Sequence, residues 1–307
     1  MYAVYKNMSR HFHPETDPLH PGRDRWKSFR SAGLPRRGRW GIFEAMNWTI
    51  HATVPYPMLE NPETARLLAG NGVGPEIYLS AKTLDSLSPG HLEKTAESVR
   101  AAGVRSVTFH APFEEIWPGA RDEEARGLAV RRLSQAISVA QVFRPLGIVV
   151  HGGYYGWLYD FDADKWFKPA LRTFREVAEA AEKAGVDIFL ENVFDEVPDH
   201  LLRLRNALGS KRIGYCFDAG HATLFSGLPL HKWVEAYGRD LREMHIHDNR
   251  GQRDDHLPMG EGSINFRGVL NASLEAGASP ILTLEPHRRE HFHRGLAALQ
   301  ALLPEIR

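Results

Sequence analysis

The chain has 307 residues, of which 43% are hydrophobic and 25% are charged, which excludes the disordered and fibrous classes and allows a full hydrophobic core. Lysine plus arginine equals aspartate plus glutamate, at 38 each, so no overall field draws the protein to nucleic acid or to an anionic membrane. A single cysteine, Cys216, excludes an internal disulfide, and no apolar run approaches the roughly 18 residues of a membrane span, so we expect a cytoplasmic protein without a membrane partner.

The first 41 residues differ in composition from the rest of the chain. They are rich in Arg, Pro and His, they show no sustained helical or strand period, and they carry nine basic residues against three acidic ones. We predict that residues 1–45 are an N-terminal extension, either a poorly packed arm or residues upstream of the true start, since Met46 immediately precedes the first strand-like run. An arm that binds nucleic acid is the alternative.

From residue 46 onward, short apolar runs alternate with amphipathic stretches of helical period. The predicted strands cover residues 47–56, 75–82, 105–113, 147–154, 187–194, 213–221, 242–249 and 280–287. The helices that follow them cover residues 62–69, 89–102, 122–143, 163–184, 198–208, 231–239, 266–276 and 290–303. Runs such as GIVV and PILTL are typical of parallel strands that are buried on both faces. The sequence therefore predicts an α/β protein, a (β/α)8 TIM barrel forming a single domain over residues 46–307, with a doubly wound sheet as the alternative.

Residue types that ligate metals stand at the ends of six consecutive predicted strands. They are His110, His151, Glu191, Asp218, His245 and Glu285, and the chain as a whole is rich in histidine, with 16. In a barrel the C-terminal strand ends converge on one mouth, so these residues come within coordination distance. Unpaired carboxylates and imidazoles there are costly unless a cation or a substrate compensates them. The sequence predicts a metal site, and the absence of sulfur ligands favours zinc, manganese, cobalt or Fe(II).

The stretch LREMHIHDNRGQRDDHLPMGEG, residues 241–262, is the densest in ligand chemistry. His245 and His247 occupy alternate positions of a predicted strand and so share one face. The loop after this strand adds the polar side chains Asp248, Arg250, Arg253, Asp254, Asp255 and His256. Asp254 and His256, together with His221, could hold a further ion or contact the substrate; a solvated polar loop at the barrel rim is the alternative.

The motifs HAPF, HGG, LEN, FDAGH, HIHD, DDHLPMGEG and LEP, in that order, resemble those of the xylose isomerase-like TIM barrel superfamily over residues 46–303. This superfamily contains sugar phosphate isomerases and epimerases and endonuclease IV. The endonuclease IV branch implies three zinc ions at nine positions, which match His110, His151, Glu191, Asp218, His221, His245, Asp254, His256 and Glu285.

The ketose epimerase branch of the resemblance implies a smaller centre. It has one divalent ion, and the matching ligands are Glu191, Asp218, His245 and Glu285. The two glutamates would be acid and base. Further side chains would contact the substrate, and the candidates are His221, His247, Arg250 and Arg253.

Together these features predict a sugar or sugar phosphate isomerase or epimerase that uses one to three divalent ions, zinc or manganese, and moves a proton next to a metal-bound carbonyl. LENVFDEVP departs from the glycine-containing stretch that follows the metal glutamate of endonuclease IV, and the zero net charge lacks a cationic surface for duplex DNA. The first alternative is an endonuclease IV-like zinc phosphodiesterase acting on abasic DNA, which the nine matching positions imply and which the basic residues 1–41 keep open. The second is a non-catalytic barrel that binds metal and sugar. The oligomeric state is left open.

Overall fold

Eight parallel strands pair in sequence order in the structure, a computed structural model that describes residues 48–306. The strands are β1 (Ile50–Pro55), β2 (Gly74–Tyr78), β3 (Thr108–His110), β4 (Ile148–His151), β5 (Ile188–Glu191), β6 (Ile213–Asp218), β7 (Leu241–Ile246) and β8 (Ile281–Leu284). The sheet closes because β1 pairs with both β2 and β8. The predicted TIM barrel is confirmed, whereas the proposed extension over residues 1–45 lies outside the described residues.

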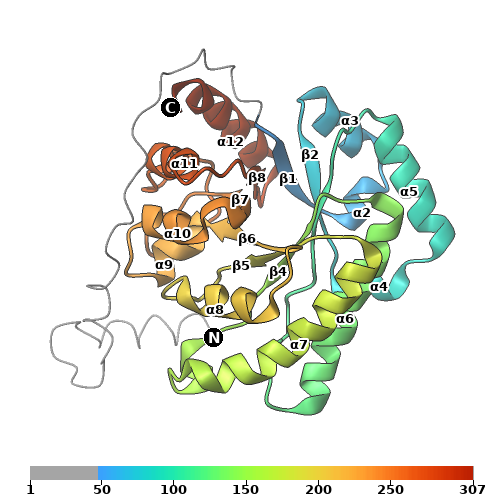
Figure 1. Cartoon of the computed structure of the whole chain (residues 1–307). Helices are drawn as coiled ribbons and strands as arrows, with labels where there is room; N and C mark the ends of the chain where they lie inside the picture. The colour runs from blue at the N-terminus through green and yellow to red at the C-terminus, as the bar shows by residue number, and fades with distance from the viewer. Residues whose placement is uncertain (1–47, 307) are drawn as a thin grey trace. The chain divides into compact units, whose positions relative to one another are not determined.

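Helices surround the barrel (Figure 1). They are α2 (Tyr56–Leu59), α3 (Pro62–Gly70), α4 (Ala81–Ser86), α5 (Pro89–Ala101), α6 (Glu123–Phe143), α7 (Ala163–Ala184), α8 (Asp199–Leu208), α9 (Ala219–Phe225), α10 (Leu230–Tyr237), α11 (Phe266–Glu275) and α12 (Arg289–Leu302). Each of the eight predicted helices matches one of these to within two residues at either end. None of the helices between residues 48 and 306 combines the length and the apolar character needed to cross a membrane.

Side-chain caps explain several element boundaries. The second strand was predicted to reach residue 82, but it ends at Tyr78 because the Ser80 hydroxyl accepts the backbone N–H of Thr83 at 3.1 Å and starts α4. The Asp122 carboxylate likewise accepts the N–H groups of Glu124 and Ala125, both at 2.9 Å, and starts α6. These caps fix where each helix leaves the barrel.

The long helix α7 anchors the loops that follow β3 and β4. Its Trp166 is fully buried, and the indole Nε1 donates to the carbonyl of Gly152 at 3.1 Å. Two turns further along α7, the Thr173 hydroxyl donates to the carbonyl of Pro118 at 2.7 Å. These contacts hold the two loops in place at the C-terminal end of the barrel, where the predicted ligands lie.

The inside of the barrel contains a layer of polar side chains, where branched apolar side chains are usual. The strand register places Glu76 of β2 beside Thr53 of β1 and beside Thr108 of β3. The Thr53 hydroxyl donates to Glu76 Oε1 at 2.7 Å, and the hydroxyls of Thr108 and Thr283 donate to Glu243 Oε1. Glu76 and Glu243 are both fully buried. We call these five residues, with His51, the polar layer.

His51 is the histidine of this layer, and its ring is fully hydrogen-bonded. Its Nδ1 lies 2.9 Å from the Thr108 hydroxyl, and its Nε2 lies 2.9 Å from the Ser106 hydroxyl. Since the Thr108 proton goes to Glu243, Nδ1 of His51 donates to Thr108 and Nε2 accepts from Ser106. Burial lowers the pKa of His51 to about 4, with Glu76 acting in the opposite direction, so the ring is neutral at pH 7.

Candidate metal centre

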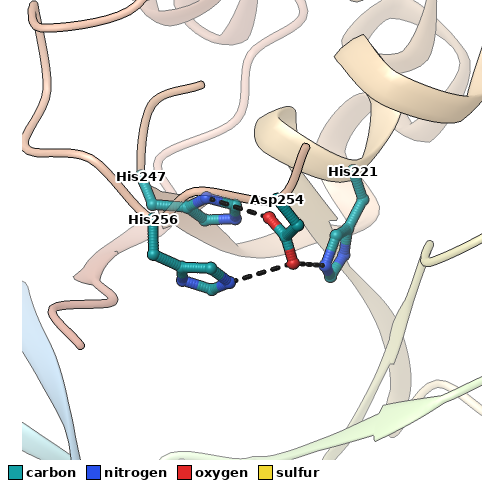
Figure 2. A group of neighbouring side chains, drawn as sticks. All are labelled: His221, His247, Asp254 and His256. Carbon is teal, nitrogen blue, oxygen red and sulfur yellow. Dashed lines mark hydrogen bonds and ion pairs between the residues drawn. The ribbon is translucent and has the colours of Figure 1, made fainter. Parts of the chain in front are cut away.

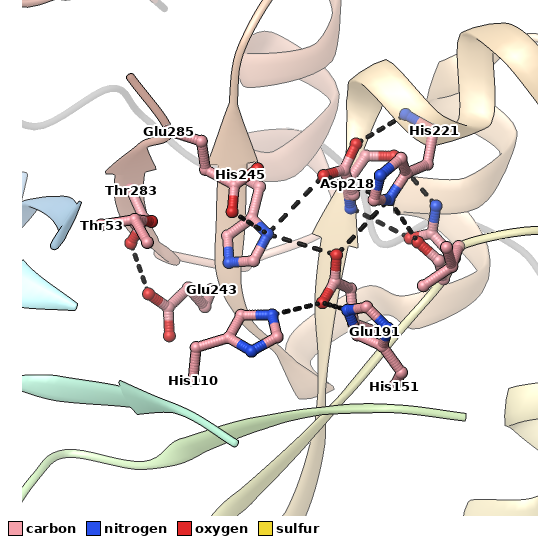
Figure 3. Close-up of polar contacts among 12 residues, drawn as sticks. Thr53, His110, His151, Glu191, Asp218, His221, Glu243, His245, Thr283 and Glu285 are labelled. Carbon is pink, nitrogen blue, oxygen red and sulfur yellow. Dashed lines mark hydrogen bonds and ion pairs between the residues drawn. The ribbon is translucent and has the colours of Figure 1, made fainter. Parts of the chain in front are cut away.

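The side chains at the C-terminal ends of β3 to β8 face one another at one mouth of the barrel (Figure 3). The structure brings together all nine residues that the sequence singled out as ligands, and His247 joins them. We divide them into three neighbouring groups, and His247 also forms a candidate set with Asp218 and Glu285. The first group is His110, His151 and Glu191; the central group is Glu191, Asp218, His245 and Glu285; the outer group is His221, His247, Asp254 and His256.

The central group is arranged around Nδ1 of His245. This nitrogen lies 3.3 Å from an oxygen of Glu191, 3.6 Å from an oxygen of Asp218 and 3.4 Å from an oxygen of Glu285. It is buried, and no side chain among residues 48–306 forms a hydrogen bond with it. Ligand atoms placed tetrahedrally at about 2.0–2.2 Å from an ion are about 3.3–3.6 Å from one another. The spacing and the missing hydrogen bond therefore fit a divalent ion.

The first group shares Glu191 with the central group. Nε2 of His110 and Nε2 of His151 lie 3.2 and 3.1 Å from Glu191 Oε2, while Glu191 Oε1 faces His245. The His110 Nδ1 donates to the carbonyl of Ala111 at 2.8 Å, so Nε2 is the nitrogen that faces Glu191 and that would bind an ion after losing its proton. A carboxylate with one oxygen in each group can bridge two ions.

The outer group consists of three imidazoles around Asp254 (Figure 2). Asp254 Oδ2 lies 3.1 Å from His256 Nε2 and 3.5 Å from His221 Nε2, and Oδ1 lies 3.7 Å from His247 Nδ1. The His221 Nδ1 lies 3.2 Å from the carbonyl of Asn192 and donates to it, so Nε2 is the nitrogen that faces Asp254 and that would bind an ion after losing its proton. Three imidazoles and one carboxylate are a ligand set that suits zinc.

His247 lies between the central and outer groups. Its Nε2 is 3.1 and 3.0 Å from the two carboxylate oxygens of Asp218, and 3.5 Å from an oxygen of Glu285. The prediction that His245 and His247 share one face is confirmed, because both face the cluster. His247 is therefore a buried side chain among candidate ligands, and the substrate contact assigned to it from the sequence stays a prediction.

The FDAGH motif places two of these side chains through a helix cap. The Asp218 Oδ1 accepts the backbone N–H of His221 at 2.6 Å and starts α9, which brings the two side chains to the same mouth. Gly220 is required between them, since a Cβ there would lie 2.1 Å from Cε1 of His247. The motif thus encodes close packing as well as ligands.

The loop that carries Asp254 and His256 is organised by Asp248. Its backbone exchanges two hydrogen bonds with Leu257, at 2.8 and 2.9 Å, and its carboxylate accepts the N–H groups of Gly260 and Ile264. His256 itself has a left-handed backbone with φ of 45°, a conformation that costs a non-glycine residue about 1 kcal/mol. The loop holds it there with the imidazole 3.1 Å from Asp254.

Opposite charges stabilise each other across the cluster. Burial disfavours a charge on Glu191, but His151 and His245 hold the pKa of that carboxyl well below its usual range. Burial likewise disfavours a charge on Asp218, but His221 and His247 hold the pKa of its carboxyl well below the usual range. Against the effect of its own burial, Glu191 raises the pKa of His110 to about 9. An ion bound by these groups would displace protons from the imidazoles, so the affinity for the ion depends on pH.

A family model for the xylose isomerase-like TIM barrel matches residues 71–305. The chain belongs to this family. The resemblance deduced from the ordered motifs is thereby confirmed. Members of the xylose isomerase-like family are mostly enzymes, among them epimerases, isomerases and endonuclease IV.

The curated relatives of this xylose isomerase-like barrel include uncharacterized proteins and probable endonucleases. An uncharacterized protein from Methanocaldococcus jannaschii is 32% identical over 65% of this chain and 70% of its own length. A probable endonuclease 4 from Mycobacterium tuberculosis is 27% identical over 59% of this chain and 75% of its own length.

Solved structures show the same fold. A D-tagatose 3-epimerase-like protein has a TM-score of 0.69 and 28% identity over 76% of this chain and 89% of its own. A Thermus thermophilus protein soaked with ZnCl2 has a TM-score of 0.69 and 27% identity over 84% of this chain and 99% of its own.

Two predicted substrate residues of the xylose isomerase-like barrel lie at the surface. Arg250 is exposed and donates to the carbonyl of Glu261 at 3.2 Å, and the exposed Arg253 pairs with Asp255 at 3.3 Å. Their role in binding substrate stays a prediction. Sequence reasoning missed the carboxylates of the polar layer beneath the cluster. The signal that marks them is a charged residue inside an otherwise apolar strand.

Proposed function

We propose that this xylose isomerase-like barrel is a divalent-metal-dependent isomerase or epimerase of sugars or sugar phosphates. The central group carries the proposal. Glu191 at the end of β5 and Glu285 just after β8 place carboxylate oxygens 3.3 and 3.4 Å from the same nitrogen of His245. Two carboxylates that reach one ion position from different strands are what a two-sided proton transfer needs. The 28% identity to a D-tagatose 3-epimerase-like protein supports the assignment.

In this proposal the side chains of the central group hold the ion and transfer the proton. A divalent ion bound there would polarise a substrate carbonyl and the neighbouring hydroxyl. Glu191 and Glu285, one on each side of the substrate carbon, remove the proton next to the carbonyl and return a proton to the same or the opposite face. His247, 3.5 Å from the second oxygen of Glu285, orients that carboxylate.

The charge of the barrel supports a small substrate. Residues 48–306 contain 28 Lys or Arg and 34 Asp or Glu, so this part of the chain has a negative formal charge with His neutral. Proteins that hold duplex DNA neutralise phosphates with an excess of cations. A sugar or sugar phosphate requires no such surface.

Metal-dependent phosphodiester hydrolysis is the second candidate function, and a specific observation favours it. The first and outer groups adjoin the central group and supply donors for two further ions. Sites with several ions generate hydroxide and clamp phosphate oxygens. The 27% identity to a probable endonuclease 4 agrees with this candidate.

Elemental analysis tests the metal centre first. Protein purified without chelator should contain at least one equivalent of zinc, manganese, cobalt or iron per chain. Less than about a tenth of an equivalent, with no uptake when ions are added back, would end the metalloenzyme proposal.

Incubation in heavy water tests the chemistry. Ketoses, aldoses and their phosphates are incubated with the metal-loaded protein, and deuterium at the carbon next to the carbonyl is measured by mass spectrometry. Only the isomerase route breaks a carbon–hydrogen bond, so incorporation should occur in the wild type and be lost in Glu191→Gln and Glu285→Gln. Glu243→Gln, a buried carboxylate outside the three groups, should keep it.

A duplex with one abasic site is the parallel substrate. Metal-dependent nicking without deuterium incorporation would replace the isomerase by the phosphodiesterase. Tight binding of one sugar, with neither reaction, would instead favour the non-catalytic barrel.

A further inference from the structure

Behind the ring of His245, on the side away from the central group, lies Glu76 of β2. It is fully buried, and its Oε2 lies 3.0 Å from His245 Nε2. Its other oxygen, Oε1, accepts the hydroxyl of Thr53 at 2.7 Å, because the β1–β2 register sets these two residues side by side. Both oxygens of Glu76 are therefore hydrogen-bonded, and its carboxylate is fixed against the imidazole.

This contact determines which nitrogen of His245 is free to bind an ion. An ionised carboxylate only accepts hydrogen bonds, so the ring proton is on Nε2 and the lone pair is on Nδ1. Nδ1 is the atom that the oxygens of Glu191, Asp218 and Glu285 surround. A carboxylate that accepts the second N–H of a ligating histidine also makes the imidazole a better ligand and fixes its plane.

We propose that Glu76 is a positioning residue for the ion of the central group, acting through His245. The inference rests on the metal centre of the proposed function and adds a residue to it from β2, a strand that supplies none of the predicted ligands. Loss of such a carboxylate typically lowers metal affinity about 10- to 100-fold. The first and outer groups do not include His245, so the affinity of ions bound there should stay unchanged.

The chain offers a matched control in Glu243. This residue is as buried as Glu76 and belongs to the same polar layer. One of its carboxylate oxygens lies within 4.8 Å of a possible metal-ligand atom of Glu76 and of one of His245. Its hydrogen bonds within the described part of the chain come from Thr108 and Thr283, not from the imidazole. Glu243→Gln therefore disturbs the layer without disturbing the His245 contact.

The test is a competition for zinc between the full-length protein and a chromophoric chelator. Glu76→Met should lower the affinity for one zinc ion about 10- to 100-fold. Glu76→Gln should lie between Glu76→Met and the wild type, because its amide oxygen still accepts the N–H but carries no charge. Glu243→Gln should match the wild type. In the cobalt-substituted protein, the visible absorption of one ion should change in the two Glu76 variants only.

Several outcomes would overturn the inference. They are wild-type zinc affinity in a folded Glu76→Met protein, equal losses in Glu76→Met and Glu243→Gln, and a uniform weakening of every ion. If circular dichroism shows that Glu76→Met is unfolded, Glu76→Gln and Thr53→Val decide in its place. Thr53→Val removes the hydroxyl that holds Glu76 and should lower the affinity for the same zinc ion several-fold. Wild-type zinc affinity in both Glu76→Gln and Thr53→Val would contradict the inference. A wild-type protein that binds none of zinc, manganese, cobalt and iron would refute the proposed function itself, whereas the other results leave it standing.

Discussion

The polar layer inside the barrel and the cluster at its mouth use the same residue types, but their hydrogen bonding differs. In the layer, each ring nitrogen of His51 has one hydroxyl partner at 2.9 Å. At the mouth, Nδ1 of the equally buried His245 has three carboxylate oxygens at 3.3 to 3.6 Å and no hydrogen bond to the described residues. A buried polar atom without a partner costs about 1–3 kcal/mol. The contrast separates the two histidines, one held on both nitrogens in a structural network and one with a nitrogen that faces carboxylates alone; the layer in turn leaves Glu243 Oε2 without a hydrogen bond to the described residues.

Glu191→Ala should produce the largest effect, because Glu191 places one oxygen in the first group and the other in the central group. We expect the ions of both groups to be lost, as measured by elemental analysis after dialysis. Glu243→Gln, the buried carboxylate of the layer, should keep the wild-type ion content. Full ion content in folded Glu191→Ala would mean that the cluster is a structural network like the layer beneath it.

Substitution of His245 and of His247 should lower the affinity for the central ion to different degrees. His245→Ala should weaken the central ion more than about 100-fold, and His247→Ala only about 10-fold, because His247 lies at hydrogen-bonding distance from Asp218 rather than inside the central group. Chelator competition on both variants measures this. Equal losses would make His247 a ligand of the central ion as well as a member of the outer group.

His51→Gln tests the layer through pH. Burial lowers the pKa of His51 from 6.5 to about 4, so between these values the unfolded chain binds a proton that the folded chain does not. The free energy of unfolding should therefore fall as the pH drops from 6.5 towards 4, with a contribution from His51 of about 3 kcal/mol. Urea unfolding of the wild type and of His51→Gln gives the free energy of unfolding at each pH. The free energy of the wild type should fall more steeply than that of the variant as the pH drops from 6.5 towards 4. Parallel curves would show that His51 titrates normally.

Ser106→Ala should have the smallest effect. It removes the hydroxyl that donates to His51 Nε2, and an unsatisfied acceptor costs about 1–2 kcal/mol. Denaturant unfolding should show this loss, while the ion content stays at the wild-type value. A lower ion content would contradict the separation of the layer from the cluster.

The barrel and the convergence of the ligands could be predicted because both depend on local patterns. Apolar runs that alternate with helical stretches define the strands, and every parallel strand of a closed barrel ends at the same mouth. His110, Glu191 and Asp218 could therefore be placed together without knowledge of the strand register.

The polar layer could not be predicted in this way. Whether Glu76 points into the barrel or towards the helices depends on the register that sets it beside Thr53 and Thr108, which is a property of the closed sheet. The division of the ligands into three groups also required distances. Position in this loop did not determine burial, since Arg253 is exposed while Asp254, the next residue, lies in the outer group.

The scatter of the ligands over six strands also has a consequence for the order in which the chain is made. The first group is complete once Glu191 has been synthesised, and the outer group follows at His256, but the central group needs Glu285. At 5–20 residues per second, roughly 9–35 s separate His110 from Glu285 on the ribosome. A nascent or prematurely terminated chain can therefore hold at most part of the centre, and an ion in the central group identifies a polypeptide whose translation has passed the last strand.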